Sequence, residues 1–326
     1  MAVRWGIIGC GDVTEVKSGP GFQKAAGSEL VAVMRRDAVK ARDYAARHDV
    51  PRWYDRADDL IADAAVDAVY IATPPSSHCD LALRVAAAGK PCLVEKPMAL
   101  NHRECARMVE AFEHRRVPLW VAYYRRALPR FLEVRDRLGD IGRLTSVHVE
   151  ITTRLLAGSD AAIWRVDPAI AGAGLLFDLG SHAFDLLDFL VGPVTRVAAI
   201  SVNTGGRYAA EDVTTAAFQF EDGPAGSGLF NFNGPRKTDV ITFVGSDGTI
   251  ETPLFSDTDV IVLRGERAER FAIRNPPHVH QPLIQTIVDE LQGRGTCPST
   301  GESAARTSWV LDECVRDYYA HRGALR

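Results

Sequence analysis

The first third of the chain alternates short apolar runs with longer segments of helical periodicity. The apolar runs cover residues 3–8, 30–34, 68–72, 92–95 and 119–122, and helical patterns lie between them at 38–47, 78–88 and 102–114. A chain that alternates strands and helices in this way builds a parallel sheet with helices on its faces. We therefore predict an α/β fold that begins with a doubly wound parallel sheet.

From residue 143 onward, longer runs of alternating polarity replace this pattern. They cover residues 145–153, 196–202, 213–220, 228–233 and 240–244, with helical segments at 181–190, 282–291 and 301–319. Alternating runs between Gly, Asp and Pro turn signals are typical of antiparallel strands. We predict a C-terminal α+β domain with a large, mostly antiparallel open sheet. The predicted domains are residues 1–122 and 123–326, and the closing helix 301–319 could pack back on the first domain.

Charge and cysteine usage exclude several classes of protein. The 326 residues carry 38 basic and 42 acidic side chains, a net charge of −4, without the basic stripe that nucleic-acid binding requires. No apolar run approaches the roughly 20 residues that cross a bilayer, and the N-terminus lacks a signal-peptide pattern. The six cysteines are scattered without a C-x-x-C pair, so neither a metal site nor disulfides are predicted. We expect a cytoplasmic protein that binds a small molecule and neither nucleic acid nor membrane.

A glycine turn follows the first predicted strand and opens a helical stretch. It reads Gly9-Cys10-Gly11-Asp12-Val13-Thr14. In dinucleotide-binding folds the first glycine allows a tight turn, the second lets the backbone approach the pyrophosphate, and the third permits close packing of helix and strand. The first five of these residues are therefore predicted to bind a nicotinamide dinucleotide. Thr14 stands where the third glycine is usual, which weakens the match.

The end of the second predicted strand selects between NAD(H) and NADP(H). An acidic residue there binds the ribose 2′-hydroxyl, whereas arginine accepts a 2′-phosphate. The sequence has Arg35 and Arg36 at this point, followed by Asp37, and guanidinium groups bind phosphate well. We predict a preference for NADP(H), with NAD(H) possible. Alternatively, both arginines are solvated and Asp37 caps the next helix.

Two more polar segments follow predicted strands. Thr73-Pro74-Pro75-Ser76-Ser77-His78 comes after 68–72, and Glu95-Lys96-Pro97 after 92–95. Ligands of open α/β sheets bind at the carboxyl ends of the strands, so both segments are predicted to line the cofactor crevice. The candidate cofactor contacts are Thr73, Pro74, His78, Glu95 and Lys96. His78 could instead make a structural hydrogen bond at a helix start.

Together with Asp178-Leu179-Gly180-Ser181-His182, these motifs resemble the glucose-fructose oxidoreductase, inositol dehydrogenase and rhizopine catabolism (Gfo/Idh/MocA) family over nearly the whole chain. The resemblance implies an N-terminal Rossmann domain and a C-terminal domain with an open sheet. It implies NAD(P)-dependent oxidation or reduction of sugars, polyols and related diols. It also implies a cis peptide before Pro97 and a Trp-Arg pair, here Trp164 and Arg165, that reaches the cofactor from the second domain.

Lys96, Asp178 and His182 are the predicted catalytic residues. Hydride transfer at a carbinol carbon needs a group that takes or gives the hydroxyl proton, and His182 is suited to this. Asp178 precedes it by four residues, so on a helix it shares a face with His182 and could orient the imidazole. Lys96 would polarise the same oxygen, as the resemblance implies. Which of Lys96 and His182 transfers the proton stays open, and each of the three residues could instead have a structural role.

Weaker signals concern the substrate and the oligomer. Tyr124 and His278 are candidate substrate contacts, with His280 as a further possibility, whereas Arg125 and Arg126 could be helix surface. Gly172 and Gly174 indicate a close backbone approach. An exposed sheet face carrying Phe218, Phe230 and Phe232 would support a homodimer or homotetramer through the C-terminal sheet.

The leading hypothesis is an NADP(H)-dependent oxidoreductase that acts on a sugar, an anhydrosugar, a polyol or a cyclic diol. One alternative is a non-catalytic regulatory protein of the same fold that senses a dinucleotide. A second is a glycosidase that uses tightly bound NAD for transient oxidation. Lys96, Asp178 and His182 argue against the first alternative, and the paired arginines argue against the second.

Overall fold

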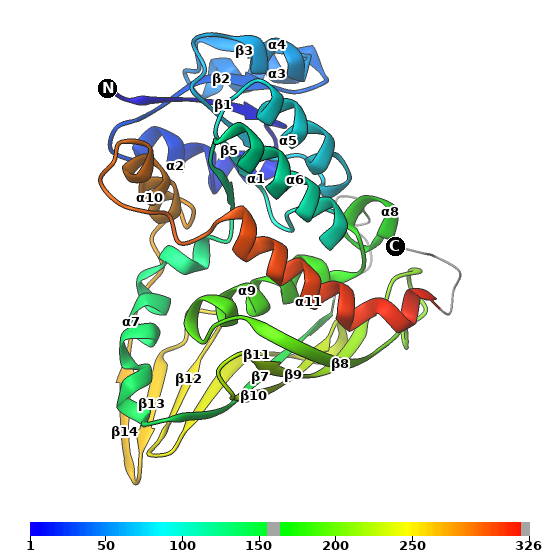
Figure 1. Cartoon of the computed structure of the whole chain (residues 1–326), viewed down its shortest axis with the longest axis vertical. Coiled ribbons are helices and arrows are strands. Elements are labelled where there is room, and N and C mark those ends of the chain that lie inside the picture. Colours follow the sequence, from blue (N-terminus) through cyan, green and yellow to red (C-terminus); the bar gives the residue numbers. More distant parts are fainter. Residues whose placement is uncertain (155–163, 321–326) are drawn as a thin grey trace. The chain divides into compact units, whose positions relative to one another are not determined.

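The computed structural model describes residues 1–154 and 164–320, which form two compact units (Figure 1). Unit 1 contains Met1–Ala99, Arg103–Leu128 and Pro276–Ala305, and unit 2 contains Leu100–His102, Pro129–Asn275 and the chain from Arg306 onward. The sequence pattern had suggested one boundary, after residue 122. That boundary stays a prediction for the folding domains. The late segment Pro276–Ala305 belongs to unit 1.

Unit 1 is built on a six-stranded parallel sheet with the order β3-β2-β1-β4-β5-β6. Its strands are β1 (Val3–Ile8), β2 (Ser28–Met34), β3 (Arg52–Tyr54), β4 (Ala68–Ile71), β5 (Cys92–Val94) and β6 (Leu119–Val121). The order reverses direction between β1 and β4, which is the point where open α/β sheets bind ligands. The predicted doubly wound sheet is confirmed, and β3 is an additional edge strand.

Helices cover both faces of this sheet, as expected for buried parallel strands. The helices that begin in or belong to unit 1 are α1 (Asp12–Val16), α2 (Gly19–Lys24), α3 (Ala38–Arg47), α4 (Ala57–Ala62), α5 (His78–Ala87), α6 (His102–Arg115), α10 (Gln281–Leu291) and α11 (Gly301–Ala320). Val69 and Ile71 of β4 face a core that includes Phe112 of α6. Tyr70 faces the other core, which includes Phe22 of α2. Alternate residues of one strand thus supply two hydrophobic cores.

Unit 2 contains an eight-stranded sheet with the order β14-β13-β12-β11-β7-β10-β9-β8. All pairs are antiparallel except β7 with β10. The strands are β7 (Leu144–Arg154), β8 (Val194–Val202), β9 (Val213–Phe220), β10 (Ala225–Asn231), β11 (Asn233–Gly245), β12 (Thr249–Thr252), β13 (Val260–Arg264) and β14 (Arg267–Phe271); the helices are α7 (Pro129–Arg137), α8 (Pro168–Ala171) and α9 (Ser181–Leu190). The predicted open, mostly antiparallel sheet is confirmed.

One face of this sheet is covered by α9. The ring of Phe184 on α9 lies 5.5 Å from that of Phe218 and 5.3 Å from that of Phe230, between centroids. The prediction that Phe218, Phe230 and Phe232 lie on an exposed face is wrong, because all three are buried. Strand alternation places them on the same side as α9, and polar residues such as Thr215 and Ser227 occupy the open face.

The segment Pro168–Leu190 is long and apolar enough, by length and composition, to cross a membrane. It comprises α8, a π-helical turn at Leu176–Gly180 and α9. However, 83% of its most apolar window is buried inside the structure. This burial against the sheet accounts for its apolar character, as in the core helix of a globular domain.

Candidate functional site

The glycine turn connects β1 to α1 at the carboxyl edge of the parallel sheet. Gly9 has φ +94°, and a Cβ there would lie 2.7 Å from Cγ2 of Thr73, so only glycine fits without strain. A Cβ at Gly11 would meet no described heavy atom closer than 3.9 Å, the nearest being a guanidinium nitrogen of Arg35 and a carbonyl oxygen of the turn. The space above Gly11 is therefore open, as the approach of a pyrophosphate to the backbone requires.

Thr14 explains how the turn functions without a third glycine. Its buried hydroxyl accepts a hydrogen bond from the Gly11 amide (2.9 Å) and donates one to the Gly11 carbonyl (2.8 Å). The backbone carbonyl of Thr14 in turn accepts from the Tyr44 hydroxyl on α3 (2.9 Å). The side chain thus closes the first turn of α1, where Asp12 and Val13 present amides that have no acceptor inside the helix.

Arg35 follows β2 and lies beside the glycine turn. Its guanidinium donates to the carbonyl oxygen of Cys10 (3.2 Å), and the Cys10 thiol is buried, which raises its pKa to about 11. Arg36 is exposed. Asp37 caps α3 by accepting the amide of Lys40 (3.2 Å). Asp37 therefore caps the helix, as the alternative interpretation predicted, and Arg35 faces the glycine turn.

His78 begins α5 and is completely buried. Its Nε2 lies 2.7 Å from the carbonyl oxygen of Thr73, and its Nδ1 lies 3.1 Å from that of Pro97. Burial lowers the pKa of His78, although both carbonyl contacts favour the charged form. The structure differs here from the prediction of a direct cofactor contact, because the ring joins two loops and offers no surface to a ligand. Thr73 and Pro74 remain accessible on the first of these loops.

Glu95 follows β5, and its carboxylate turns into the protein. Oε1 accepts hydrogen bonds from the Tyr70 hydroxyl (2.5 Å) and from Nε2 of His280 (3.1 Å), and Oε2 accepts the amide of Lys96 (3.0 Å). Burial by itself would raise the pKa of Glu95, but the hydrogen bonds and the charges of His280 and Lys96 lower it to about 2. Glu95 was predicted to contact the cofactor. The structure instead makes it a buried anchor behind Lys96.

Lys96 stands between this anchor and Pro97 at the carboxyl end of β5. The Lys96–Pro97 peptide is cis, so this expectation is confirmed. The side chain of Lys96 is partly exposed, in contrast to its neighbours Glu95 and Pro97, which are buried. An ammonium group at this edge of the sheet lies on the same side as the glycine turn, because the parallel strands β1 and β5 end there.

The two weaker histidine and tyrosine candidates occupy different places in unit 1. Tyr124 stacks on His280 with 4.4 Å between ring centroids, and His280 bonds Glu95. His278 instead places Nδ1 3.2 Å from the carbonyl oxygen of Val16 at the end of α1. The histidine of this segment that joins the Lys96 surroundings is therefore His280, and not the His278 that was ranked first.

Arg125 and Arg126 follow β6 in a 3₁₀ turn. They are only 5% and 3% exposed, so the interpretation as helix surface is wrong. Arg126 donates to the carbonyl oxygen of Pro298 (3.0 Å), and the guanidinium of Arg125 lies 4.9 Å from the centre of the Tyr124 ring. Both residues are therefore buried, and these two contacts lie within unit 1.

Asp178 and His182 belong to unit 2, where a π-helical turn leads into α9. Asp178 lies in the turn Leu176–Gly180, and His182 is the second residue of α9. Four residues correspond to about one turn in either helix type, so the two side chains leave the same side. Such π turns are frequent at functional sites. His182 is 4% exposed, and its ring meets Phe255 edge-on at 6.0 Å.

Arg165 and Phe255 lie beside this pair in unit 2. Nε of Arg165 lies 3.4 Å from a carboxylate oxygen of Asp178, and the guanidinium stacks on Trp164 at 4.5 Å. Phe255 is held by Asp239, whose carboxylate accepts the backbone amides of Leu254, Phe255 and Ser256. Trp164 and Arg165 are thus near Asp178, and their predicted contact with the cofactor stays a prediction.

The predicted close backbone approach at Gly172 and Gly174 is confirmed. A Cβ at Gly172 would lie 2.5 Å from the carbonyl oxygen of Leu100, and one at Gly174 would meet the carbonyl oxygen of Glu211. Residues 155–163, which precede them, lie outside the described residues.

The predicted residues thus fall into two groups. Gly9 to Val13, Arg35, Thr73, Glu95 and Lys96 gather at the carboxyl edge of the parallel sheet in unit 1, and Arg165, Asp178 and His182 gather at the start of α9 in unit 2. Sequence reasoning missed Tyr70, which bonds Glu95, and Phe255, which meets His182. It also missed Asp239, which holds the backbone around Phe255. Tyr70 and Asp239 are strand residues and Phe255 is a loop residue, and no sequence motif marks any of them.

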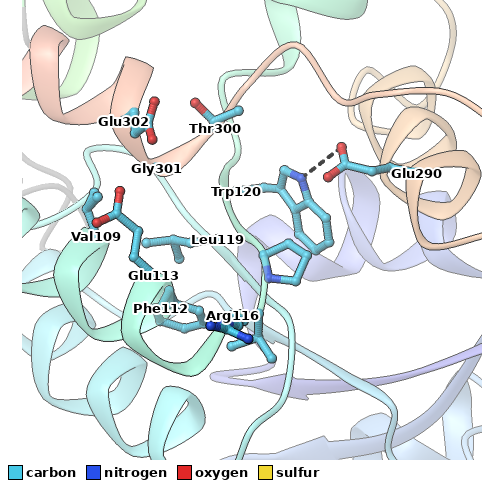
Figure 2. A pocket seen from close by; sticks show the side chains of 12 residues that line it. Val109, Phe112, Glu113, Arg116, Leu119, Trp120, Glu290, Thr300, Gly301 and Glu302 are labelled. Carbon is cyan, nitrogen blue, oxygen red and sulfur yellow. Dashed lines mark hydrogen bonds between the residues drawn. The ribbon is translucent and has the colours of Figure 1, made fainter. Parts of the chain in front are cut away.

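A separate pocket of about 240 Å³ lies at the other end of β6. Figure 2 shows Leu119 and Trp120 at its wall, with the Trp120 indole donating to Glu290 (3.3 Å). Leu119 begins β6, so this pocket is at the amino edge of the sheet. Open α/β sheets bind their ligands at the opposite edge, and we therefore assign the candidate site to the carboxyl edge.

Comparison with known proteins agrees with this arrangement. Residues 3–123 match the model of the GFO/IDH/MocA oxidoreductase family with an NAD-binding Rossmann fold, and residues 132–251 match the GFO/IDH/MocA C-terminal domain. Oxidoreductase P35 of Formosa agariphila is 38% identical over 316 residues, which cover 95% of this chain and 97% of that protein.

Two more distant proteins are similar over most of the chain. Trans-1,2-dihydrobenzene-1,2-diol dehydrogenase of Bos taurus is 28% identical over 274 residues, covering 82% of this chain and 80% of that protein. A structure of levoglucosan dehydrogenase in complex with NADH and levoglucosan superposes with a TM-score of 0.86 at 20% identity, covering 98% of each chain. The latter likeness shows a shared fold.

Proposed function

Because the chain belongs to the Gfo/Idh/MocA family of oxidoreductases, as its motifs indicated, we propose that it is an NADP(H)-dependent enzyme for alcohol–carbonyl interconversion. Its substrate is a sugar, an anhydrosugar, a polyol or a cyclic diol. The observation that carries the proposal is Lys96, a partly exposed lysine at the sheet edge that also bears the glycine turn, with its amide bound by the buried Glu95 carboxylate.

The cofactor would bind along the carboxyl edge of the parallel sheet. The open space above Gly11 suits the pyrophosphate, and Arg35 with Arg36 suits a 2′-phosphate. The nearest acid, Asp37, is already used to cap α3, which disfavours it as a partner of the ribose hydroxyl. When bound, the nicotinamide exchanges a hydride with the substrate carbon.

Lys96 and His182 supply the proton chemistry of the proposed reaction. In the oxidation direction one of them, in its neutral form, takes the hydroxyl proton, and in reduction the same group returns it to the oxygen. A charged Lys96 would also stabilise the negative charge that develops on that oxygen. Asp178 precedes His182 on the same side of the helix and is itself paired with Arg165, so it would hold the negative charge close to the imidazole.

The substrate class is supported by the character of the relatives. The bovine relative is named for a cyclic diol, and the structural neighbour was solved with an anhydrosugar. Both are small polyhydroxylated or dihydroxylated rings that donate a hydride from a carbinol carbon. A substrate of this kind needs a proton acceptor at one hydroxyl group, which Lys96 and His182 provide.

Nicotinamide absorbance tests the proposal. Purified protein is incubated with NADPH and carbonyl sugars, and with NADP⁺ and a panel of sugars, anhydrosugars, polyols and cyclic diols. Turnover with one of these classes is the expected result. Tight NADPH binding without turnover on any of them would contradict the proposed enzyme and favour the non-catalytic, dinucleotide-sensing alternative.

We also propose a reducing compartment, the cytoplasm, as the location of the protein. All six cysteines lie in the described part of the chain, where they are buried and form no disulfide. Buried thiols without disulfides suit a compartment in which thiols stay reduced.

The open face of the sheet in unit 2 supports the proposed homodimer or homotetramer, by residues other than the predicted phenylalanines. Ile200 pairs with Thr215, Thr215 with Leu229, Leu229 with Glu150, and Glu150 with Val240. Registered neighbours point to the same face. Ile200 is 72% exposed and Leu229 is 37% exposed, so this row presents apolar side chains that a second copy could cover.

Light scattering is expected to give a mass of two or four chains, and the double variant Ile200→Lys, Leu229→Lys should lower that mass toward one chain. Burial of two ammonium groups in an interface opposes association. The control is Val39→Lys, at an apolar residue of α3 that is also exposed. A single-chain mass for the unaltered protein would contradict the proposed assembly.

A further inference from the structure

His280 reaches the Lys96 segment from the far end of the sequence. It precedes α10 as the N-cap residue and is 2% exposed. Its Nε2 lies 3.1 Å from Oε1 of Glu95, and its ring stacks on Tyr124 at 4.4 Å between centroids. A histidine that is buried, stacked and bonded to one carboxylate has little freedom to rotate.

Glu95 transmits this contact to Lys96. The same carboxylate accepts the Tyr70 hydroxyl from β4 at Oε1 and the Lys96 amide at Oε2. Two side chains from other elements therefore hold one oxygen, and the second oxygen holds the peptide that carries Lys96. Rotation of the Glu95 side chain would release that peptide.

We propose that His280 is a positioning residue, which fixes the Glu95 carboxylate and thereby the Lys96 backbone from which the ammonium group is aimed. This inference rests on the proposed function of Lys96. His280 touches neither the cofactor nor the substrate in this scheme, since its ring is buried against Glu95 and Tyr124.

The hydrogen bond to Glu95 shows which ring nitrogen of His280 must carry a proton. A carboxylate only accepts, so Nε2 of His280 must carry the proton in its bond to Glu95. Nδ1 of His280 is buried without a partner among the described residues. Among the described residues, His280 therefore makes its side-chain hydrogen bond through Nε2, to Glu95.

Removal of His280 changes the titration of Glu95. The titratable groups that face Glu95 are Tyr70 on β4, His280, His78 at the start of α5 and Lys96 on its own segment. Burial raises the pKa of Glu95, and the His280 hydrogen bond heads the contributions that lower it to about 2. Without that bond the pKa rises, and Glu95 takes up a proton at a less acidic pH than it does in the native protein.

The test compares His280→Leu, which cannot donate, with His280→Gln, whose amide can. The control is His114→Leu at the exposed end of α6. For each protein kcat and KM are measured across the acid and neutral range, and the Kd of NADPH is measured by fluorescence. Misplacement of a reacting group costs up to about 100-fold. We expect kcat of His280→Leu to fall by about 10- to 100-fold, with the NADPH Kd within about twofold of the native value.

The pH profile separates positioning from simple loss of structure. In His280→Leu the acid limb of kcat should move to higher pH, because protonated Glu95 no longer holds the Lys96 amide with full charge. His280→Gln should regain most of kcat and the native acid limb. This variant also keeps the test decisive if the leucine variant fails to fold.

Three results would overturn the inference. If His280→Leu keeps the native kcat and acid limb while Lys96→Ala is inactive, His280 does not position Lys96 and the proposed function stands. If kcat falls equally at every pH and His280→Gln restores nothing, the role of His280 is structural only. If the unaltered protein turns over no substrate, the proposed function and this inference fail together.

Discussion

Lys96→Ala is expected to lower kcat about 1,000-fold while NADPH binding stays close to the native value. General acid–base catalysis contributes about 100- to 10,000-fold, and an electrostatic donor at the reacting oxygen about 100- to 1,000-fold. Lys96 is partly exposed at the sheet edge, and its side chain supplies no part of the hydrophobic cores. The truncation should therefore remove chemistry and leave the fold intact. Steady-state turnover, together with NADPH fluorescence, measures both quantities.

Lys24→Ala is the control for this change, because Lys24 is an exposed lysine at the end of α2 in the same unit. A second variant, His182→Asn, addresses the proton. If Lys96 transfers it, the ionisation seen in the pH profile of kcat/KM disappears in Lys96→Ala and persists in His182→Asn; if His182 transfers it, the pattern reverses. Turnover of Lys96→Ala at the native rate would contradict a catalytic role for this residue.

Arg35→Asp is expected to shift the ratio of NADPH to NADH affinity by about 100-fold toward NADH. A hydrogen bond to a charged group contributes about 1.5–3 kcal/mol, and 2.7 kcal/mol corresponds to about 100-fold in affinity. The guanidinium already lies at the glycine turn, bonded to Cys10, so a 2′-phosphate would find it in place. The new carboxylate would repel that phosphate and could accept a ribose hydroxyl. Dissociation constants for both cofactors, measured by fluorescence, give the ratio.

The control is Arg42→Asp, which makes the same charge change at an exposed residue of α3. Salt provides a second check, because the NADPH affinity of the native protein should weaken with ionic strength more than the NADH affinity does. An unchanged affinity ratio in Arg35→Asp would show that Arg35 does not select the cofactor.

The strands that the sequence predicted are those whose local composition is decisive. Residues 68–71 are Ala-Val-Tyr-Ile, a run that is buried on both faces and bounded by turn residues, which is typical of an inner parallel strand. Four of the described strands were not predicted. Of these, β13 is Val-Ile-Val-Leu-Arg, whose composition does favour a strand, and β12 is Thr-Ile-Glu-Thr. The two edge strands are mixed: β3 is Arg-Trp-Tyr and β14 is Arg-Ala-Glu-Arg-Phe. These edge strands form because their backbones pair with a neighbouring strand, with Ala32 opposite Arg52 and Val260 opposite Phe271. A mixed sequence of three to five residues does not indicate that such a neighbour is present.

The face of a strand was harder to predict than its existence. Phe218 and Phe230 alternate with small and polar residues, so they were expected to share one side. The pattern does not say what covers that side. Only the packing of Phe184 from α9 shows that it is the interior, which moves the candidate interface to the row that contains Ile200 and Leu229.

The candidate site divides in the same way. The sequence by itself determined the glycine turn, Arg35 and the Glu-Lys-Pro segment, because parallel strands bring the residues after their carboxyl ends to one edge whatever the rest of the chain does. Only the tertiary structure decided that Glu95 turns inward and that His280, rather than His278, meets it across 185 residues. Whether a loop residue points toward Glu95 or away from it depends on the exact path of the loop. That path is set by the packing of α10, which no local sequence pattern encodes.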